Sequence, residues 1–330
     1  MNDRFELLYT ITSHYWARSV QLAARLRIAD LISGGKTTLQ ELSAETEIDE
    51  WRLMRFLRVL AAIGIVRRSD DRYALTEKGR LLVAGTPGQV GDIARMNYYF
   101  FPAFTAIEDV LREGRPGYEV ATGTPHFDAM QSMPEFAEAF DLAMNQIFTP
   151  ETEAMVDAFD WSKFETLMDV GGGNGDTLLS ILRATPGLKG HLFDLSHVVE
   201  RAETRIAESG LAERVAATAG SFFEPLPGGA EAILLRHIVH DWQEEDILRI
   251  LGRCRDALRP GGTLLIGESL IKDSDEITLP IRLDLAMMTF YNGAERTEQE
   301  YRELLGKCGF EVFAVTEITP ALSILEARVS

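Results

Sequence analysis

Residues 169–175, Asp-Val-Gly-Gly-Gly-Asn-Gly, constrain the fold of this chain more than any other segment does. An apolar run precedes them and a helical pattern follows at 177–182, so the segment predicts a strand, a glycine turn and a helix. Glycines let the backbone approach a ligand closely, and a helix start offers free N–H groups. The G-x-G-x-G spacing differs from the G-x-G-x-x-G of dinucleotide sites. Asp194 ends the next strand-like run, where an acid that binds ribose hydroxyls is expected. The sequence therefore predicts a site for a nucleoside without a pyrophosphate.

The chain alternates strand and helix patterns from about residue 160 onward. Seven strand-like runs, rich in β-branched residues and leucine, occur at 166–170, 190–195, 214–219, 231–238, 262–268, 310–317 and 322–328. The helical stretches between them predict an α/β fold with a largely parallel sheet. A short turn that contains Pro320 joins the last two runs, so we expect these two strands to pair antiparallel.

Four further motifs follow the glycine turn: DLSHV at 194–198, GSFF at 220–223, HDW at 240–242 and GAERT at 293–297. With DVGGGNG, they resemble the motifs of S-adenosylmethionine (SAM) dependent methyltransferases, in particular the small-molecule O-methyltransferases of plants and bacteria. The resemblance covers nearly the whole chain. It implies a Rossmann-like SAM methyltransferase sheet with an N-terminal helical winged-helix dimerisation domain. It also implies a homodimeric enzyme of secondary metabolism that methylates a hydroxyl group of a small aromatic, phenolic substrate.

The N-terminal segment has the residue pattern of a winged helix. Residues 1–33 are predicted to be helical, and Thr38 and Glu41 are spaced for a capping box at the start of a short helix. A longer helix is predicted over about 50–63, and a hairpin over 65–75. The same order of elements would fit a DNA-binding regulator that takes SAM as a ligand. A basic stripe of three arginines lies on the longer helix, but its other faces are too apolar for exposure in a groove.

The resemblance implies a division of the chain into two domains. We expect residues 1–100 to form the winged-helix-like dimerisation domain. Residues 101–330 are expected to form the SAM-binding methyltransferase domain, with connecting helices at 101–155. At 330 residues, the chain is long enough for two domains.

The net charge argues against nucleic acid and anionic lipid as partners, and the two cysteines indicate reduced thiols. The formal net charge is −18, with 14 basic against 12 acidic residues over 1–100 and 19 against 39 over 101–330. So acidic a C-terminal domain would repel nucleic acid and anionic lipid, and we expect neither as a partner. Cys254 and Cys308 lie in predicted helices and are expected to be reduced core thiols. No signal peptide or apolar run of membrane-spanning length is recognisable, so we expect a cytoplasmic protein.

The resemblance assigns the cofactor to the ends of the first strands of the α/β half. Gly171 and Gly172 would approach the methionine part of SAM. Asp194 would accept both ribose hydroxyls, although the same carboxylate could instead cap the helix that follows it. Leu195 and Phe222 would sandwich the adenine. The other expected cofactor residues are Asp169, Gly173, Ser221 and Arg236.

Two of these positions depart from the family pattern. Position 221 is usually an aspartate that accepts a hydrogen bond from the adenine amino group, whereas Ser221 can accept one without charge assistance. Position 236 is commonly lysine, and Arg236 keeps the charge with a different geometry. Adenine binding could therefore be weaker, or a neighbouring group could replace the missing contact.

The predicted catalytic group is an imidazole with two acids. Methyl transfer from sulfonium to oxygen is an in-line displacement, so the protein must align the acceptor and remove its proton. A phenol has a pKa of about 10, and histidine is the natural base for it. By resemblance, His240 is that base, and Glu268 and Glu295 flank its ring and fix its tautomer. His237 would face the other way on a strand and is expected to be structural, and Asp241 is expected to cap the next helix.

No metal is expected, because the remaining histidines do not form a metal-ligand spacing with any cysteine or acidic cluster. The expected substrate wall combines methionine, aromatic and amide side chains, which suit a planar ring: Met144, Asn145, Phe148, Met287, Phe290, Tyr291 and Asn292. Three alternatives keep the fold and the SAM site. They are N-methylation, a non-methylating reaction (hydroxylase, decarboxylase or pericyclase), and, outside enzymes, the winged-helix regulator. The retained His240, Glu268 and Glu295 favour O-methylation, with S-adenosylhomocysteine as the product.

Overall fold

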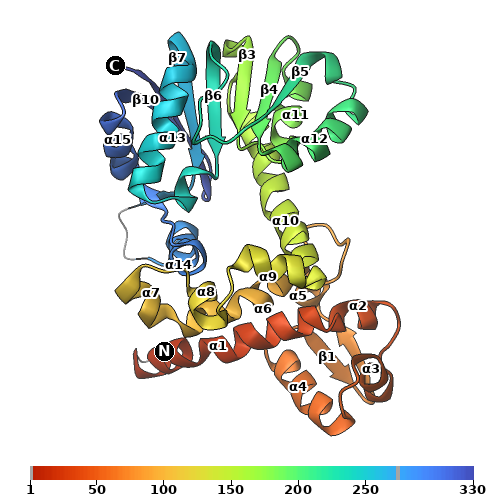
Figure 1. Cartoon of the computed structure of the whole chain (residues 1–330). Helices are drawn as coiled ribbons and strands as arrows, with labels where there is room; N and C mark the ends of the chain where they lie inside the picture. Colours follow the sequence, from red (N-terminus) through yellow and green to blue (C-terminus); the bar gives the residue numbers. More distant parts are fainter. Residues whose placement is uncertain (1–2, 273–275) are drawn as a thin grey trace. The chain divides into compact units, whose positions relative to one another are not determined.

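The computed structural model describes residues 3–272 and 276–330 (Figure 1). The chain forms two compact units, one of Met1–Thr105 with Ala121–Phe148, the other of Ala106–Val120 with Thr149–Ser330. The domain boundary at residues 100/101 stays a prediction. The chain changes unit more than once after that position, since 106–120 belongs to the second unit and 121–148 to the first.

The first unit begins with a helical bundle and a hairpin. Its elements are α1 (Asp3–Arg25), α2 (Ile28–Ser33), α3 (Leu39–Thr46), α4 (Glu50–Ala62), β1 (Val66–Ser69) and β2 (Arg72–Leu75). The capping box of Thr38 and Glu41 is present at the start of α3, and β1 pairs antiparallel with β2, as the sequence predicts. The predicted helix over 1–33 is instead two helices, because Arg27 adopts a left-handed φ of 54° between them. Leu42, Leu53 and Leu57 are fully buried and belong to the core that unites these elements.

Further helices follow the hairpin along the chain, some in the first unit and some in the second. They are α5 (Glu77–Arg80), α6 (Gly91–Thr105), α7 (Ile107–Glu113), α8 (Gly117–Thr122), α9 (His126–Ser132) and α10 (Pro134–Ala158). Between α6 and α10, the rings of Tyr99 and Phe136 stack with centroids 5.1 Å apart, and Phe100 meets Phe136 edge to face. These buried aromatic rings form the centre of the helical packing in this part of the unit.

The second unit is built on a seven-stranded sheet with the order β10-β11-β7-β6-β3-β4-β5. Its strands are β3 (Thr166–Val170), β4 (Lys189–Asp194), β5 (Val215–Ala219), β6 (Ala230–Arg236), β7 (Leu258–Glu268), β10 (Phe310–Thr319) and β11 (Leu322–Val329). β7, β6, β3, β4 and β5 are parallel, whereas β11 pairs antiparallel with both β7 and β10. All seven predicted strands and the antiparallel end of the sheet are confirmed.

Helices cover both faces of this sheet (Figure 1). They are α11 (Asp176–Ala184), α12 (Ser196–Glu208), α13 (Glu244–Ala257) and α15 (Glu298–Lys307). Successive side chains of a strand point to opposite faces. Leu167 packs in one core with α11 and α12, and its neighbour Met168 packs in the other core with α13 and α15. Burial on both faces explains why the central strands β3 and β6 read as nearly continuous apolar runs.

The remaining elements of the second unit are η1 (Trp161–Lys163), η2 (Ala212–Arg214), η3 (Val239–Asp241), β8 (Leu270–Ile271), α14 (Leu279–Tyr291) and β9 (Arg296–Thr297). Cys254 is buried on α13, and Cys308 is buried at the end of α15; both are free thiols, as predicted. No helix within 3–272 and 276–330 has the length and apolar character needed to cross a membrane.

Candidate active site

The predicted glycine turn joins β3 to α11 in a shape that excludes larger residues. Gly171 has a φ of 73°, and a Cβ there would lie 2.5 Å from Ile238 Cδ1. A Cβ on Gly172 would lie 2.5 Å from Leu192 Cδ1 and 2.6 Å from Asp169 Oδ2. A side chain at either position would have to displace these neighbours, and at Gly171 the positive φ also disfavours other residues.

Asp194 ends β4 beside this turn. Its Oδ2 accepts a hydrogen bond from the Gly173 N–H at 2.8 Å, and its Oδ1 accepts one from the Leu195 N–H at 2.6 Å. The alternative that Asp194 caps the next helix is wrong, because the N-cap of α12 is Leu195 and that cap has no side-chain hydrogen bond. Asp194 therefore ties the end of β4 to the glycine turn, and its role toward a ribose stays a prediction.

Asp169 lies beneath the turn and is almost fully buried, with 2% of its surface exposed. Among the described residues, its Oδ2 has no hydrogen-bond partner. Burial raises the pKa of the Asp169 carboxyl to about 7; the guanidinium of Arg236 opposes this rise, and Asp194 adds to it. A buried acceptor without a partner, next to a glycine turn, fits a site that receives a polar ligand.

The two residues expected to enclose adenine lie at the ends of neighbouring strands. Leu195 follows β4 and is 49% exposed, and Phe222 follows β5. A Cβ on Gly171 would lie 3.8 Å from Phe222 Cε1, so this ring is close to the glycine turn. Ser221 bonds locally: its hydroxyl accepts from the Phe223 N–H at 3.3 Å. These residues fit a nucleoside, and their contacts with one remain a prediction.

Arg236 ends β6 and links three elements below the site. It donates to Thr152 on α10 at 2.7 Å, to Thr177 on α11 at 2.8 Å and to Glu151 at 3.2 Å. Its side chain is 6% exposed. Burial lowers the pKa of Arg236 while Glu151 raises it, so this guanidinium is a fixed buried cation among the acids of the site.

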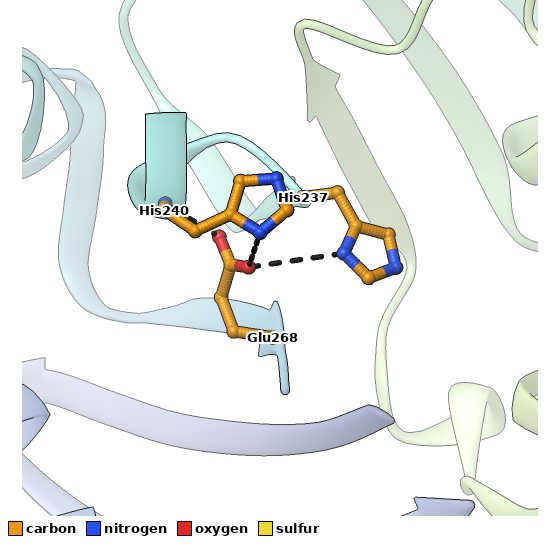
Figure 2. Close-up of side chains that lie close together, drawn as sticks. All are labelled: His237, His240 and Glu268. Atoms are coloured by element: carbon orange, nitrogen blue, oxygen red, sulfur yellow. Dashed lines mark hydrogen bonds and ion pairs between the residues drawn. The ribbon is translucent and has the colours of Figure 1, made fainter. Parts of the chain in front are cut away.

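His240 lies on η3, just beyond the carboxyl end of β6. Its Nδ1 is 3.0 Å from Glu295 Oε1 and 3.3 Å from Glu268 Oε2. Glu268 ends β7 and is fully buried; its Oε1 accepts from the N–H groups of Ile238 and Val239 at 3.1 and 2.8 Å. Thus the two predicted acids both lie at the Nδ1 side of the ring of the predicted base. Figure 2 shows Glu268 in this position.

The acids make His240 a strong base. Burial lowers the pKa of His240, but the carboxylates of Glu268, Glu295 and Asp241 outweigh burial and raise it to about 10. Because a carboxylate can only accept, the Nδ1–H donates to Glu295. Nε2, which is 3.5 Å from Asp241 Oδ1, is then the nitrogen left to exchange a proton with another molecule.

The structure corrects two expectations about the neighbours of His240. His237 does not face the other way: β6 ends at Arg236, and His237 has a φ of 53°, which turns its ring to within 5.3 Å of the His240 ring. Asp241 does not cap α13, whose N-cap is Gln243. Glu151, which accepts from His237 at 2.8 Å, has no sequence signal because it is 86 residues away.

The predicted substrate residues fall into two groups. Met287, Phe290 and Tyr291 lie on α14 of the second unit, and Asn292 is its C-cap with a φ of 63°. Burial raises the pKa of the Tyr291 hydroxyl above its usual range. The other predicted wall residues, Met144, Asn145 and Phe148, lie on α10 in the first compact unit. Their joint role as one wall stays a prediction.

Three side chains around the His240 ring could also hold a metal ion. Ring nitrogens of His237 and His240 and an oxygen of Glu268 lie within 4.8 Å of one another. A set of two imidazoles and one carboxylate is a common zinc donor set. However, the nitrogen of His240 that faces Glu268 is the one that already bonds Glu295. The expectation of a metal-free site stays a proposal.

Comparison with known proteins agrees with this geometry. A family model for an O-methyltransferase dimerisation domain matches residues 9–85, and one for an O-methyltransferase domain matches residues 104–311. The phenazine O-methyltransferase PhzM of Lysobacter antibioticus is 34% identical over 98% of this chain and 95% of its own length. The aclacinomycin 10-hydroxylase RdmB of Streptomyces purpurascens is 36% identical over 88% of this chain and 80% of its own.

A solved structure shows the same fold. The O-methyltransferase NcsB1 from neocarzinostatin biosynthesis, crystallised with SAM and 2-hydroxy-5-methyl naphthoic acid, has a TM-score of 0.86 and 31% sequence identity. The match covers 95% of this chain and 96% of that one. With a glycine turn, an acid-flanked histidine and both family domains in place, the chain belongs to the SAM-dependent O-methyltransferase family.

Proposed function

We propose that the protein transfers a methyl group from SAM to a hydroxyl of a small aromatic, phenolic substrate, with His240 as the general base. The observation that carries the proposal is the contact of His240 Nδ1 with Glu295 at 3.0 Å and with Glu268 at 3.3 Å. This contact leaves Nε2 as the ring nitrogen that, in the neutral imidazole, would take the proton of a substrate hydroxyl. The carboxylates also stabilise the imidazolium that forms.

The residues around the glycine turn fit SAM. Bound there, SAM would supply an electrophilic methyl group that needs no further activation. Gly171, Gly172 and Gly173 would admit its methionine part, and Asp169 would offer a buried acceptor beneath it. Asp194 would accept from the ribose, while Leu195, Ser221 and Phe222 would surround the adenine. Arg236 would act indirectly, because its hydrogen bonds to Thr177 and Thr152 brace the turn and α10.

The strength of the base suits a phenol. His240 has a pKa raised to about 10, and phenolic hydroxyls have a pKa of about 10. Proton transfer between two groups of matched pKa is close to thermoneutral, which favours general base catalysis. With this raised pKa, we expect His240 of the free enzyme to be an imidazolium at neutral pH. Activity should therefore increase with pH from neutral up to the pKa of His240.

The substrate class rests on the wall residues and on the relatives. Met287, Phe290 and Tyr291 on α14 are proposed to contact the substrate, as are Met144, Asn145 and Phe148 on α10. Of the two O-methyltransferases compared above, PhzM is named for a phenazine substrate. NcsB1 was crystallised with a naphthoic acid. A planar hydroxylated aromatic of secondary metabolism is the corresponding proposal for this chain.

We also propose that the protein works as a homodimer in the cytoplasm. The dimerisation domain spans 9–85, and α1 exposes large apolar side chains: Phe5, Leu8, Tyr9, Ile11 and Tyr15, each at least 45% exposed. So continuous an apolar face is typical of a surface that a partner covers. Sedimentation velocity should give the mass of a dimer at micromolar concentration, and a monomer mass would contradict the proposal.

The test of the base combines a substrate screen with one variant. Wild type is incubated with methyl-tritiated SAM and a panel of phenols and naphthols, and products are counted after extraction. His240→Ala should lose about 10²–10⁴-fold in rate, while calorimetric SAM affinity stays within a few-fold of wild type. His197→Ala, at an exposed position on α12, is the matched control. Undiminished turnover by His240→Ala would refute the base assignment.

A second function deserves a direct test because a hydroxylase is among the relatives. Mass spectrometry of the same reactions separates the two outcomes, since one product gains a methyl group and the other gains an oxygen atom. A hydroxylated product without methylation would support the hydroxylase alternative. Methylation confined to heteroaromatic nitrogens, with little effect of His240→Ala, would support N-methylation instead.

A further inference from the structure

Glu295, one of the two acids at the His240 ring, lies in a short loop between α14 and β9 that packs against the base. The N–H of Ala294 donates to the carbonyl of His240 at 2.8 Å. A Cβ on Gly293 would overlap the same carbonyl oxygen, so a side chain there would displace the loop. The backbone of this loop is therefore in direct contact with the backbone of η3.

The backbone N–H of Glu295 has its acceptor outside this loop. Glu295 is 4% exposed, and a buried N–H requires a hydrogen-bond acceptor. β9 begins at Arg296 and α15 begins at Glu298, so neither a strand ladder nor a helix supplies one. The acceptor is Oδ1 of Asp284 on α14, at 3.0 Å. A side chain of α14 thus fixes the backbone of the acid.

Glu295 is consequently held at two points. Its N–H is fixed by Asp284, and its Oε1 lies 3.0 Å from His240 Nδ1. Without the acceptor on α14, the backbone of Glu295 could shift, and its carboxylate would shift with it. Such a displacement matters, because misplacing a catalytic group by about 1 Å can cost about 10²-fold in rate.

Asp284 also links the acid to the proposed substrate wall. Asp284, Met287 and Tyr291 follow one another on α14 at steps of three and four residues, which places them on one face of the helix. The carbonyl of Met287 accepts from the N–H of Gly293 at 3.2 Å. The helix face that carries two proposed substrate residues is therefore bonded to the loop of Glu295 at two places.

We propose that Asp284 is a positioning residue: the hydrogen bond that it accepts from the Glu295 N–H sets the Glu295 carboxylate against the His240 ring and ties it to α14. The proposal deepens the proposed function and rests on His240 being the base. Asp284 acts through the backbone of Glu295 and not through its own charge. An amide oxygen in the same place should therefore serve as well.

The test compares substitutions of Asp284 in the full chain. Asp284→Ala removes the acceptor, whereas Asp284→Asn keeps a side-chain oxygen of the same reach and removes only the charge. Arg282→Ala, at an exposed position of the same helix, is the matched control. Circular dichroism and calorimetric SAM binding check that each variant is folded. Should Asp284→Ala fail to fold, Asp284→Ser replaces it, because the serine oxygen is one bond nearer to α14.

The first readout is kcat with SAM and the substrate that the screen identifies. Asp284→Ala should lower kcat by about 10–100-fold, with SAM affinity within a few-fold of wild type. Asp284→Asn and Arg282→Ala should keep kcat within a few-fold of wild type. A double-mutant cycle adds Asp284→Ala to Glu295→Ala. Because Asp284 acts only through the Glu295 carboxylate, the second substitution should then lower kcat less than about twofold.

The second readout needs no substrate. Hydrogen–deuterium exchange of residues 292–297, followed by mass spectrometry, should be faster in Asp284→Ala than in wild type and restored in Asp284→Asn, because an amide that loses its acceptor exchanges faster. This result in a protein that methylates nothing would support the inference and refute the proposed function.

Three results would overturn the inference in an active methyltransferase. One is a wild-type kcat in Asp284→Ala. Another is an Asp284→Asn variant as impaired as Asp284→Ala, which would make the charge decisive instead of the hydrogen bond. The third is an equal fall in kcat with and without the Glu295 carboxylate, which would show a general structural role.

Discussion

Replacing Glu295 with glutamine should move the pH profile of methyl transfer in a known direction. Glutamine has the same shape, and its Oε1 can still accept the hydrogen bond that His240 Nδ1 gives to Glu295 at 3.0 Å. The variant therefore changes the charge beside the ring and leaves its tautomer. In the wild type, the acids outweigh burial and raise the pKa of His240 to about 10.

The size of the shift follows from the distances. An opposite charge within about 4–6 Å raises the pKa of a base by about 1–3 units, and three carboxylates act on His240 from 3.0, 3.3 and 3.5 Å. Losing the nearest one should lower the pKa by about 1–2 units, which is about 1.4–2.7 kcal/mol of imidazolium stabilisation. The midpoint of kcat/KM should thus fall from about 10 toward about 8–9.

The assay is the initial rate of methyl transfer between about pH 6 and 10.5, where the wild-type rate rises throughout the range. Glu295→Gln should reach its plateau at lower pH, and the plateau itself should be lower, because the variant base is weaker. Glu303→Gln, an exposed substitution on α15, is the charge-matched control and should leave the midpoint unmoved. A Glu295→Gln profile with the wild-type midpoint would refute the electrostatic account of His240.

Three further predictions address the cofactor site and the metal question. Asp194→Ala should weaken SAM binding, because it removes the proposed ribose acceptor and the bond to Gly173; equal calorimetric affinity would refute that role. Asp169→Asn should weaken SAM binding yet raise the free energy of unfolding without SAM by about 1–3 kcal/mol at pH 8. The folded-state pKa of Asp169 is about 7, above the ordinary value of an aspartate. The neutral carboxyl therefore contributes to the free energy of unfolding at low pH, and this contribution is lost as the pH rises through 7. A denaturant titration that shows no gain at pH 8 would contradict it. EDTA dialysis should leave methyl transfer unchanged, and a loss that a divalent ion restores would make the His237–His240–Glu268 cluster a metal centre.

Local patterns predicted the parts of the fold that depend on local physics. The strands, the glycine turn and the capping box at Thr38 and Glu41 follow from side-chain periodicity and hydrogen-bond spacing, which act over a few residues. The approach of His240 to Glu268 and Glu295 came from the resemblance of ordered motifs, because these residues are 28 and 55 positions apart. No periodicity could have brought them together.

The failures have an equally physical cause. The orientation expected for His237 assumed that β6 continues through this residue. His237 instead has a left-handed φ of 53°, and the sequence has no glycine or asparagine at this position to indicate it. The cap expected at Asp241 assumed that α13 begins at the motif, whereas a turn of 3-10 helix comes first. Glu151 pairs with His237 across 86 residues, and a single sequence contains no information about such a pairing.

The strand order explains why His240 lies near the glycine turn. β7, β6 and β3 are neighbours in the sheet, so Glu268, the turn that carries His240 and the glycine turn share one edge. Glu268 and Glu295 are buried there, and burial makes each carboxylate act strongly on the ring because little water screens it. The same dry surroundings raise the pKa of Asp169. A substrate with an apolar ring would exclude water from this edge, so we predict that aromatic hydroxyls are better acceptors than small polar alcohols.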